Sequence, residues 1–289
     1  MGMKVPDHHP PIARPLATVH RILVVVLVAG CSHVPPATEP GPADAANGIS
    51  LQDGWRATVL VQRDDSIILT LPSGDQQLQR FDRRAGFTLT MDGDGRISLR
   101  LDSLTFRPKS SNAPGTPLGA TWAGRASDAH VDALRVTGGG DPAAELTAVV
   151  RNLLPRLPAG GVHARMRWAD SSTGDVRVDI FRASEHRTAT WSTGTISERA
   201  GGNILPVLVR EDFEQLGDGQ QGGHKLTMTS QGRRSGTYYL TDDGRVSGAQ
   251  LDDSVAMLIS IPATKQVVPT MRYGRTIVRF IPLTRNESD

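Results

Sequence analysis

The chain has 289 residues, with 32 basic and 30 acidic side chains and a single cysteine. That length is enough for one large or two small domains with a sizeable core. One cysteine excludes an internal disulfide and a metal site built from several thiolates. Three of the basic and one of the acidic side chains lie in residues 1–30. The rest of the chain is therefore neutral, which argues against nucleic-acid binding and against capture by anionic lipid through charge alone.

The first 30 residues are organised like a signal peptide. Lys4, Arg14 and Arg21 precede an unbroken apolar stretch at residues 22–30. Nine residues are too few for a membrane-spanning helix, which needs about 20, but they suit the apolar core of a signal peptide. A buried strand is the alternative, and the basic flank argues against it. We therefore predict that residues 1–30 are a signal peptide.

The end of the apolar stretch, Val28-Ala29-Gly30-Cys31, resembles the lipobox of bacterial lipoproteins. The resemblance implies cleavage before Cys31, a diacylglycerol on its thiol and an acyl chain on its new N-terminus. Two or more lipid chains are what stable anchoring requires. By resemblance to lipoprotein sorting in Gram-negative bacteria, Ser32 implies delivery to the outer membrane. The expected location is thus the cell envelope, with the protein lipid-anchored in the outer membrane and facing the periplasm.

Proline is frequent between the lipobox and the first strand-like segment, at positions 35, 36, 40 and 42. Such a composition stays extended and unpacked. Residues 31–50 are therefore predicted to be the lipidated cysteine followed by a tether.

Residues 51–289 are predicted to form a mainly β domain. Apolar and polar residues alternate, which is typical of strands with one buried and one wet face. Asp-Gly turns at residues 92–95 and 242–244 favour tight hairpins and hence an antiparallel sheet. The clearest alternating stretches are residues 57–62, 86–91, 96–101, 175–181 and 276–281.

One segment has helical spacing instead. Asp141 can cap a helix, Pro142 fits its first turn and Pro155 stops it. We predict a helix at residues 142–154, packed on the concave side of the sheet, and a second, weaker helix at residues 209–216. The apolar residues of the first helix are Leu146, Val149, Val150, Leu153 and Leu154.

Residues 79–98 and 231–247 echo each other: each has a glycine, an alternating strand, an Asp-Gly turn and Arg-(Ile/Val)-Ser. Two explanations remain open. The domain consists of two similar halves, residues 51–140 and 160–289, joined by the helix, or strand periodicity alone produces the match.

The order of lipobox, proline-rich tether, β-rich half, short helix, Trp168 segment and closing strand resembles a group of uncharacterised bacterial lipoproteins. Those are similar in turn to LolA/LppX-type lipoprotein carriers. The resemblance covers most of residues 51–289 and rests on layout rather than on a chemical motif. It implies a strongly curved antiparallel half-barrel, α+β in class, with one or two short helices against its hollow and an apolar cavity.

No catalytic or metal-binding motif is present. The segment Asp92-Gly-Asp-Gly-Arg96 resembles the start of a calcium loop but lacks its closing glutamate, which favours a plain hairpin. Residues 138–140 are glycines before a helix, without the lysine of a phosphate-binding loop. No nucleophile elbow appears. The histidines of the mature chain have no paired spacing: His33, His130, His163, His186 and His224.

The four tryptophans, Trp55, Trp122, Trp168 and Trp191, are the largest apolar side chains. Tryptophan on a strand is typical of a core, although a poorly filled hollow would let such residues line a pocket for an acyl chain. We expect a non-enzymatic envelope lipoprotein without cofactor or metal that binds a lipid or other apolar ligand, at residues the sequence does not identify. The alternatives are a scaffold for an envelope protein complex and a hydrolase of envelope material.

Overall fold

The computed structural model describes residues 48–93, 95–107, 118–127, 130–138, 140–199 and 202–283. These residues belong to one compact unit, Ala37–Asp289. The predicted signal peptide, the lipidation site Cys31 and the tether up to residue 47 lie outside the described residues.

The described chain is mainly β and forms one antiparallel sheet, as predicted. The strand order is β5-β4-β3-β2-β1-β12-β11-β10-β9-β7-β6, and β8 pairs with β9 in addition. The strands are β1 (Trp55–Thr70), β2 (Gln76–Met91), β3 (Arg96–Arg107), β4 (Thr121–Ser127), β5 (His130–Thr137), β6 (Arg167–Val178), β7 (Phe181–Thr193), β8 (Ser197–Arg199), β9 (Gly202–Gln221), β10 (His224–Thr241), β11 (Val246–Ile261) and β12 (Gln266–Pro282).

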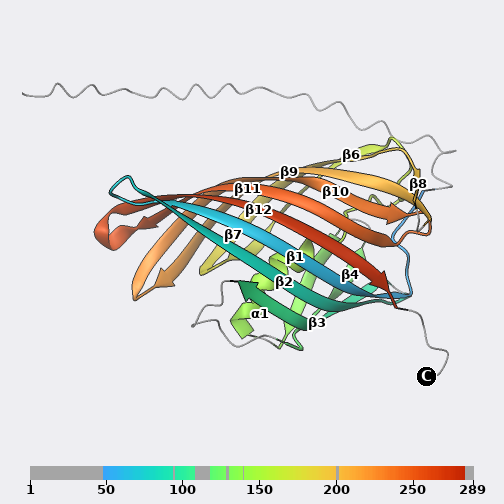
Figure 1. Ribbon diagram of the computed structural model, residues 1–289, viewed down its shortest axis with the longest axis horizontal. Coiled ribbons are helices and arrows are strands. Elements are labelled where there is room, and N and C mark those ends of the chain that lie inside the picture. The colour runs from blue at the N-terminus through green and yellow to red at the C-terminus, as the bar shows by residue number, and fades with distance from the viewer. Residues whose placement is uncertain are drawn as a thin grey trace, which may run out of the picture. The chain divides into compact units, whose positions relative to one another are not determined.

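The middle of the sheet joins the two ends of the described chain. Strand β1 pairs with β2 on one side and with β12 on the other, which is seen in Figure 1 as a blue strand beside a red one. Most of the other neighbours are consecutive in sequence. The two predicted Asp-Gly hairpins are confirmed between β2 and β3 and between β10 and β11, where Gly95 and Gly244 have φ values of 73° and 81°.

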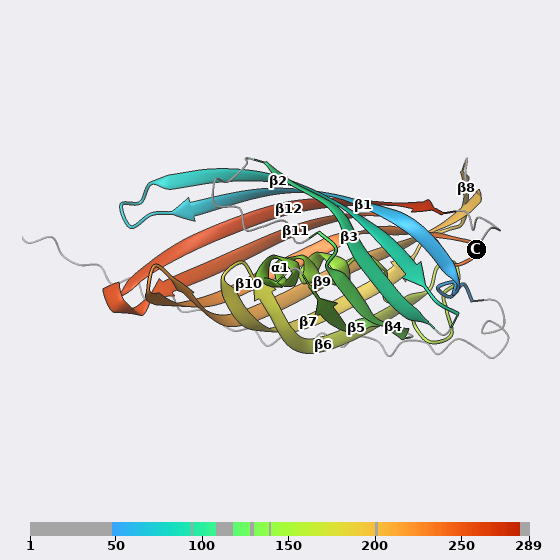
Figure 2. The ribbon, with the colours of Figure 1, turned by 90° about the horizontal axis from the view of Figure 1, so that it is seen from below.

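The two edge strands, β5 and β6, follow each other in the chain and are joined by helix α1 (Gly140–Arg151). Within the described residues, neither edge pairs with the other. The backbone of α1 lies against both edges, and Figure 2 shows the helix at the open side of the sheet. The prediction that it packs on the concave face is wrong, because a short connection between the two edge strands has to bridge the opening.

Within the described ranges, the apolar side chains on the inner face of the sheet form two separate clusters. The larger cluster combines Leu146 and Val150 of α1 with residues such as Phe87, Trp122 and Trp191. The indole Nε1–H of Trp122 donates to Thr147 Oγ1 at 2.9 Å, which ties α1 to β4. The smaller cluster lies toward the β6–β7 and β9–β10 hairpins: Val178, Phe181, Ala183, Phe213, Leu226, Met228, Val255 and Met257.

Two local predictions are wrong. Residues 209–216 are not helical but belong to β9. Residues 175–181 are not one strand, because β6 ends at Val178 and β7 begins at Phe181. Between them Asp179 has a φ of 51°, a left-handed conformation that aspartate tolerates better than most residues.

Candidate functional site

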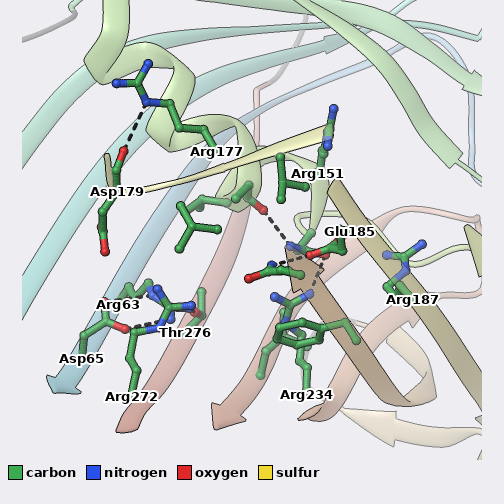
Figure 3. Close-up of a pocket in the computed structure, with 18 of the residues that line it drawn as sticks. Arg63, Asp65, Arg151, Arg177, Asp179, Glu185, Arg187, Arg234, Arg272 and Thr276 are labelled. Carbon is green, nitrogen blue, oxygen red and sulfur yellow. Dashed lines mark hydrogen bonds and ion pairs between the residues drawn. The ribbon is translucent and has the colours of Figure 1, made fainter. Parts of the chain in front are cut away.

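A cavity of about 620 Å³ lies between the end of α1 and the inward faces of the strands (Figure 3). Its walls come from both ends of the described chain, including Arg63 of β1, Asn152 after α1, Arg187 of β7 and Thr276 of β12. Its volume falls in the range of about 300 to 1,000 Å³ that small-molecule sites occupy. The cavity is therefore large enough for a sizeable organic ligand.

The inward-facing positions turn polar half-way along six neighbouring strands. In β9, for example, the buried Val207 and Val209 are followed on the same face by Glu211, which is 3% exposed, and then by Phe213. This row separates the two apolar clusters along β7, β9, β10 and β11. We call it the polar belt: Arg63, Thr276, Asp253, Arg234, Glu211 and Arg187.

Arg63 is the most fully bonded member of the polar belt. Its guanidinium donates to both carboxylate oxygens of Asp253 at 2.8 and 3.0 Å and to both of Asp65 at 2.7 and 3.0 Å. A fifth hydrogen bond reaches Thr276 Oγ1 at 2.9 Å. All five N–H groups of this arginine are therefore used, so its role is structural.

The ion pair between Arg63 of β1 and Asp253 of β11 crosses the strand between them, β12. The position it crosses is Gly274, which pairs with Asp65 on one side and with Asp253 on the other. A Cβ there would meet Arg63 Nη2 and would lie 2.9 Å from Asp253 Oδ1. The absence of a side chain at residue 274 thus makes room for the pair.

A second group of charges centres on Glu211. Its carboxylate accepts a hydrogen bond from Arg234 Nη1 at 2.9 Å and a longer one from Arg187 Nη1 at 3.4 Å. Arg234 also donates to Asn152 Oδ1 at 3.0 Å, and its guanidinium lies 5.6 Å from the centre of the Phe213 ring. One buried carboxylate is therefore shared by two arginines.

The ionisation of the polar belt follows from these contacts. Burial alone would raise the pKa of Asp253, but the ion pair with Arg63, helped by Arg234 and Arg272, holds that pKa below its usual value. For Arg63, burial acts to lower the pKa and is outweighed by Asp253 and Asp65, so the pKa is raised. For Tyr238, burial and the charge of Glu211 raise the pKa. Asp253 and Arg63 are consequently charged at neutral pH.

The cavity combines this charge with exposed apolar surface. Phe81 of β2 and Phe106 of β3 line it and are 39% and 37% exposed. Ile67 and Val176 line it as well. A ligand that contacts the cavity therefore meets both phenyl rings and guanidinium groups.

The residues singled out in the sequence do not build this site. The tryptophans are packed in or against the larger cluster, where Trp168 and Trp191 stack at 5.9 Å, and none of the four lines the cavity. Asp92 begins a hairpin turn. His163 bonds the carbonyl of Ala164, and His186 bonds Thr173.

Within the ranges that the structure describes, no three histidine, cysteine or acidic residues lie together as metal ligands. In the same ranges, no helix combines the length and apolarity needed to cross a membrane.

No protein-family model and no curated protein matches the chain. Among solved structures, OccK11 (OpdR) of Pseudomonas aeruginosa aligns at 8% identity over 81% of this chain and 99% of that chain, with a TM-score of 0.19. OccK2 (OpdF) of the same organism, in complex with glucuronate, aligns at 9% identity over 83% and 99% of the two chains, with a TM-score of 0.18. Scores this low carry no argument about fold or function.

Proposed function

We propose that this chain is a non-enzymatic lipoprotein of the cell envelope, anchored at Cys31. It binds a lipid or other apolar ligand in the cavity between the end of α1 and the sheet. The observation that carries the proposal is the exposure of Phe81 and Phe106 inside a hollow of about 620 Å³. Large apolar side chains are seldom left uncovered in a concave site unless a ligand covers them.

The apolar wall is continuous along neighbouring strands. Phe81 of β2 pairs directly with Asp65 of β1, and Ile67 is the next residue of β1 on the same face. Phe106 comes from β3, the strand on the other side of β2, where it pairs with Arg83. The wall therefore spans three strands, which is enough breadth for an acyl chain to lie along it.

The predicted anchor and tether agree with such a role. A protein held at a membrane by lipid on Cys31, through the proline-rich segment that the sequence predicts to be a tether, stays close to lipid ligands. The alternative, a scaffold for an envelope protein complex, requires a protein partner on the outer surface and leaves the exposed phenyl rings of the cavity unexplained.

In the test, the full chain is extracted from cells in a mild non-ionic detergent. Native mass spectrometry then measures the mass of any lipid that stays bound to it. The variant is Phe81→Ser, and the matched control is Leu78→Ser on the same strand. Leu78 is 52% exposed and, three residues away, faces the opposite side of β2. Both substitutions remove an exposed apolar side chain, but only Phe81→Ser changes the cavity.

The proposal predicts a lipid adduct on the unaltered chain and on Leu78→Ser, and a clearly smaller adduct on Phe81→Ser. No adduct on any of the three proteins would overturn it, as would equal loss in both variants.

A further inference from the structure

We infer that the ligand is an anionic amphiphile, with a phosphate or carboxylate head group held by arginines of the cavity and an apolar tail along Phe81 and Phe106. The inference rests on the proposed function and names its ligand class. It follows from the charge balance of the cavity, from two arginines with unused buried donors, and from where one of them lies.

Basic residues outnumber acidic ones in the cavity wall. Among the residues that the structure describes, eight arginines line it, against three acidic residues, Asp65, Asp179 and Glu185. Adding the carboxylates directly behind the wall, Asp170, Asp253 and Glu211, still leaves an excess of positive charge. Uncompensated charge in a partly buried site is unfavourable, and a bound anion would offset it.

The arginines differ in how many donors the protein uses. Arg63 has no N–H left over, as described above. By contrast, the Nε–H groups of Arg187 and Arg272 are buried and form no hydrogen bond with any residue of the described ranges. Within the described part of the chain, Arg272 has no ion pair shorter than 4 Å, although its charge contributes to the low pKa of Asp253. A guanidinium with free donors is suited to the paired oxygens of phosphate or carboxylate.

Arg272 also adjoins the apolar wall. It is the direct cross-strand partner of Ile67. Asp65 is the preceding residue of β1 on the same face, and it pairs with Phe81. Directly paired side chains on one face of a sheet are about 5 Å apart. An acidic group bound at Arg272 would therefore have its tail next to Ile67 and Phe81.

The same anionic chemistry could belong to a lipid head group or to a small free anion. The exposed rings of Phe81 and Phe106 favour the lipid, because a small phosphate or carboxylate would leave them uncovered. The experiment below uses both kinds of probe.

The experiment titrates the full chain, in non-ionic detergent, with three probes and follows complexes by native mass spectrometry. The probes are dioctanoyl phosphatidylglycerol, dioctanoyl phosphatidylcholine and glycerol 3-phosphate. The first two share their tails and differ in net charge, while the third has the anionic group without a tail. The variant is Arg272→Gln, and the control is Arg279→Gln, an exposed arginine on the opposite face of the same strand.

We expect phosphatidylglycerol to bind more tightly than phosphatidylcholine, and glycerol 3-phosphate to bind weakest. Arg272→Gln should weaken phosphatidylglycerol by about tenfold or more, the effect of losing a charge-assisted hydrogen bond. It should weaken phosphatidylcholine less, because the choline cation of that lipid already neutralises its phosphate, and Arg279→Gln should alter neither. Because Arg272 forms no hydrogen bond to a described residue, the variant is expected to fold, which its unfolding curve will verify.

The outcomes separate the inference from the proposed function. If the two lipids bind equally and Arg272→Gln weakens neither, the inference of an anionic head group is overturned. The proposal of a lipid-binding cavity then still stands. Glycerol 3-phosphate binding as tightly as phosphatidylglycerol supports the anion site and overturns the lipid. Failure of both lipids to bind overturns the proposed function and the inference together.

Discussion

Asp253→Asn tests the polar belt by removing one charge from its best-defined ion pair. The side chain of Asp253 is 1% exposed and receives two hydrogen bonds from Arg63 at 2.8 and 3.0 Å. The substitution keeps the shape of the residue but replaces one acceptor oxygen with an NH₂ group, which faces a guanidinium that can only donate. It therefore leaves Arg63 with Asp65 as its single anionic partner.

Breaking a buried ion pair from one side costs about 3 to 5 kcal/mol. Asp65 retains two contacts with Arg63, which places the expected loss near the lower end, at about 3 kcal/mol. That is a large share of the stability of a domain, which is about 5 to 15 kcal/mol.

The assay is urea unfolding of the full chain at pH 7, compared with Asp252→Asn. Asp252 is the preceding residue on the same strand, but it is 47% exposed and pairs at 2.7 Å with Arg275, which is 57% exposed. Its replacement should shift the unfolding midpoint far less, because exposed pairs contribute little. Equal shifts in the two variants would refute the assignment of the buried pair.

Acid should reduce the difference between Asp253→Asn and the unaltered protein. The pKa of Asp253 is lower in the folded protein than in the unfolded chain, so the stabilisation is fully present above the unfolded-state value of about 3.9. It is lost as the pH falls through the folded-state pKa. A difference between the two proteins that stays constant down to pH 2 would contradict this sign.

Three further predictions each concern a single residue. Gly274→Ala should lower the unfolding free energy in urea by about 1 to 3 kcal/mol, because its methyl group meets the Arg63–Asp253 pair, and an unchanged midpoint would speak against that packing. Tyr238→Phe removes the hydrogen bond of 3.1 Å to the carbonyl of Asn152, so about 1 kcal/mol should be lost and amide exchange in α1 should accelerate; unaltered exchange would show that this bond does not hold the helix end. Cys31→Ser should abolish incorporation of labelled palmitate in cells, and continued labelling would exclude the lipobox.

The strands could be predicted where most positions of one face are apolar. Residues 57–62 and 276–281 alternate because their inward side chains, such as Val59 and Phe280, belong to the larger cluster. The Asp-Gly turns could be predicted equally well, because their backbone geometry depends on the two turn residues alone.

The polar belt explains why residues 209–216 looked helical. Val209 and Phe213 face inward, but the inward positions that alternate with them carry Glu211 and Gln215. With polar residues at those two positions, the remaining apolar residues recur every four residues, which is the spacing of a helix. The sequence therefore predicts a helix at the part of β9 that carries polar residues of the site.

The site could not be assembled from the sequence because its contacts are long-range. Arg63 and Asp253 are 190 positions apart, and Arg234 and Asn152 are 82 apart. A signal was nevertheless present: in β1 the inward series Val59, Val61 continues into Arg63. A charged residue at the next inward position of such a series indicates either that the strand ends there or that the interior is polar.

The central claim, a ligand in the cavity, is tested most directly by photocrosslinking in living cells. A photoreactive benzoylphenylalanine is placed at position 81 in the cavity or at position 78 on the outer face of the same strand, in the full chain. The account predicts a lipid adduct after irradiation at position 81 and none at position 78. The claim is contradicted if position 81 gives no lipid adduct, or if position 78 captures one protein in fixed proportion while the cavity stays empty.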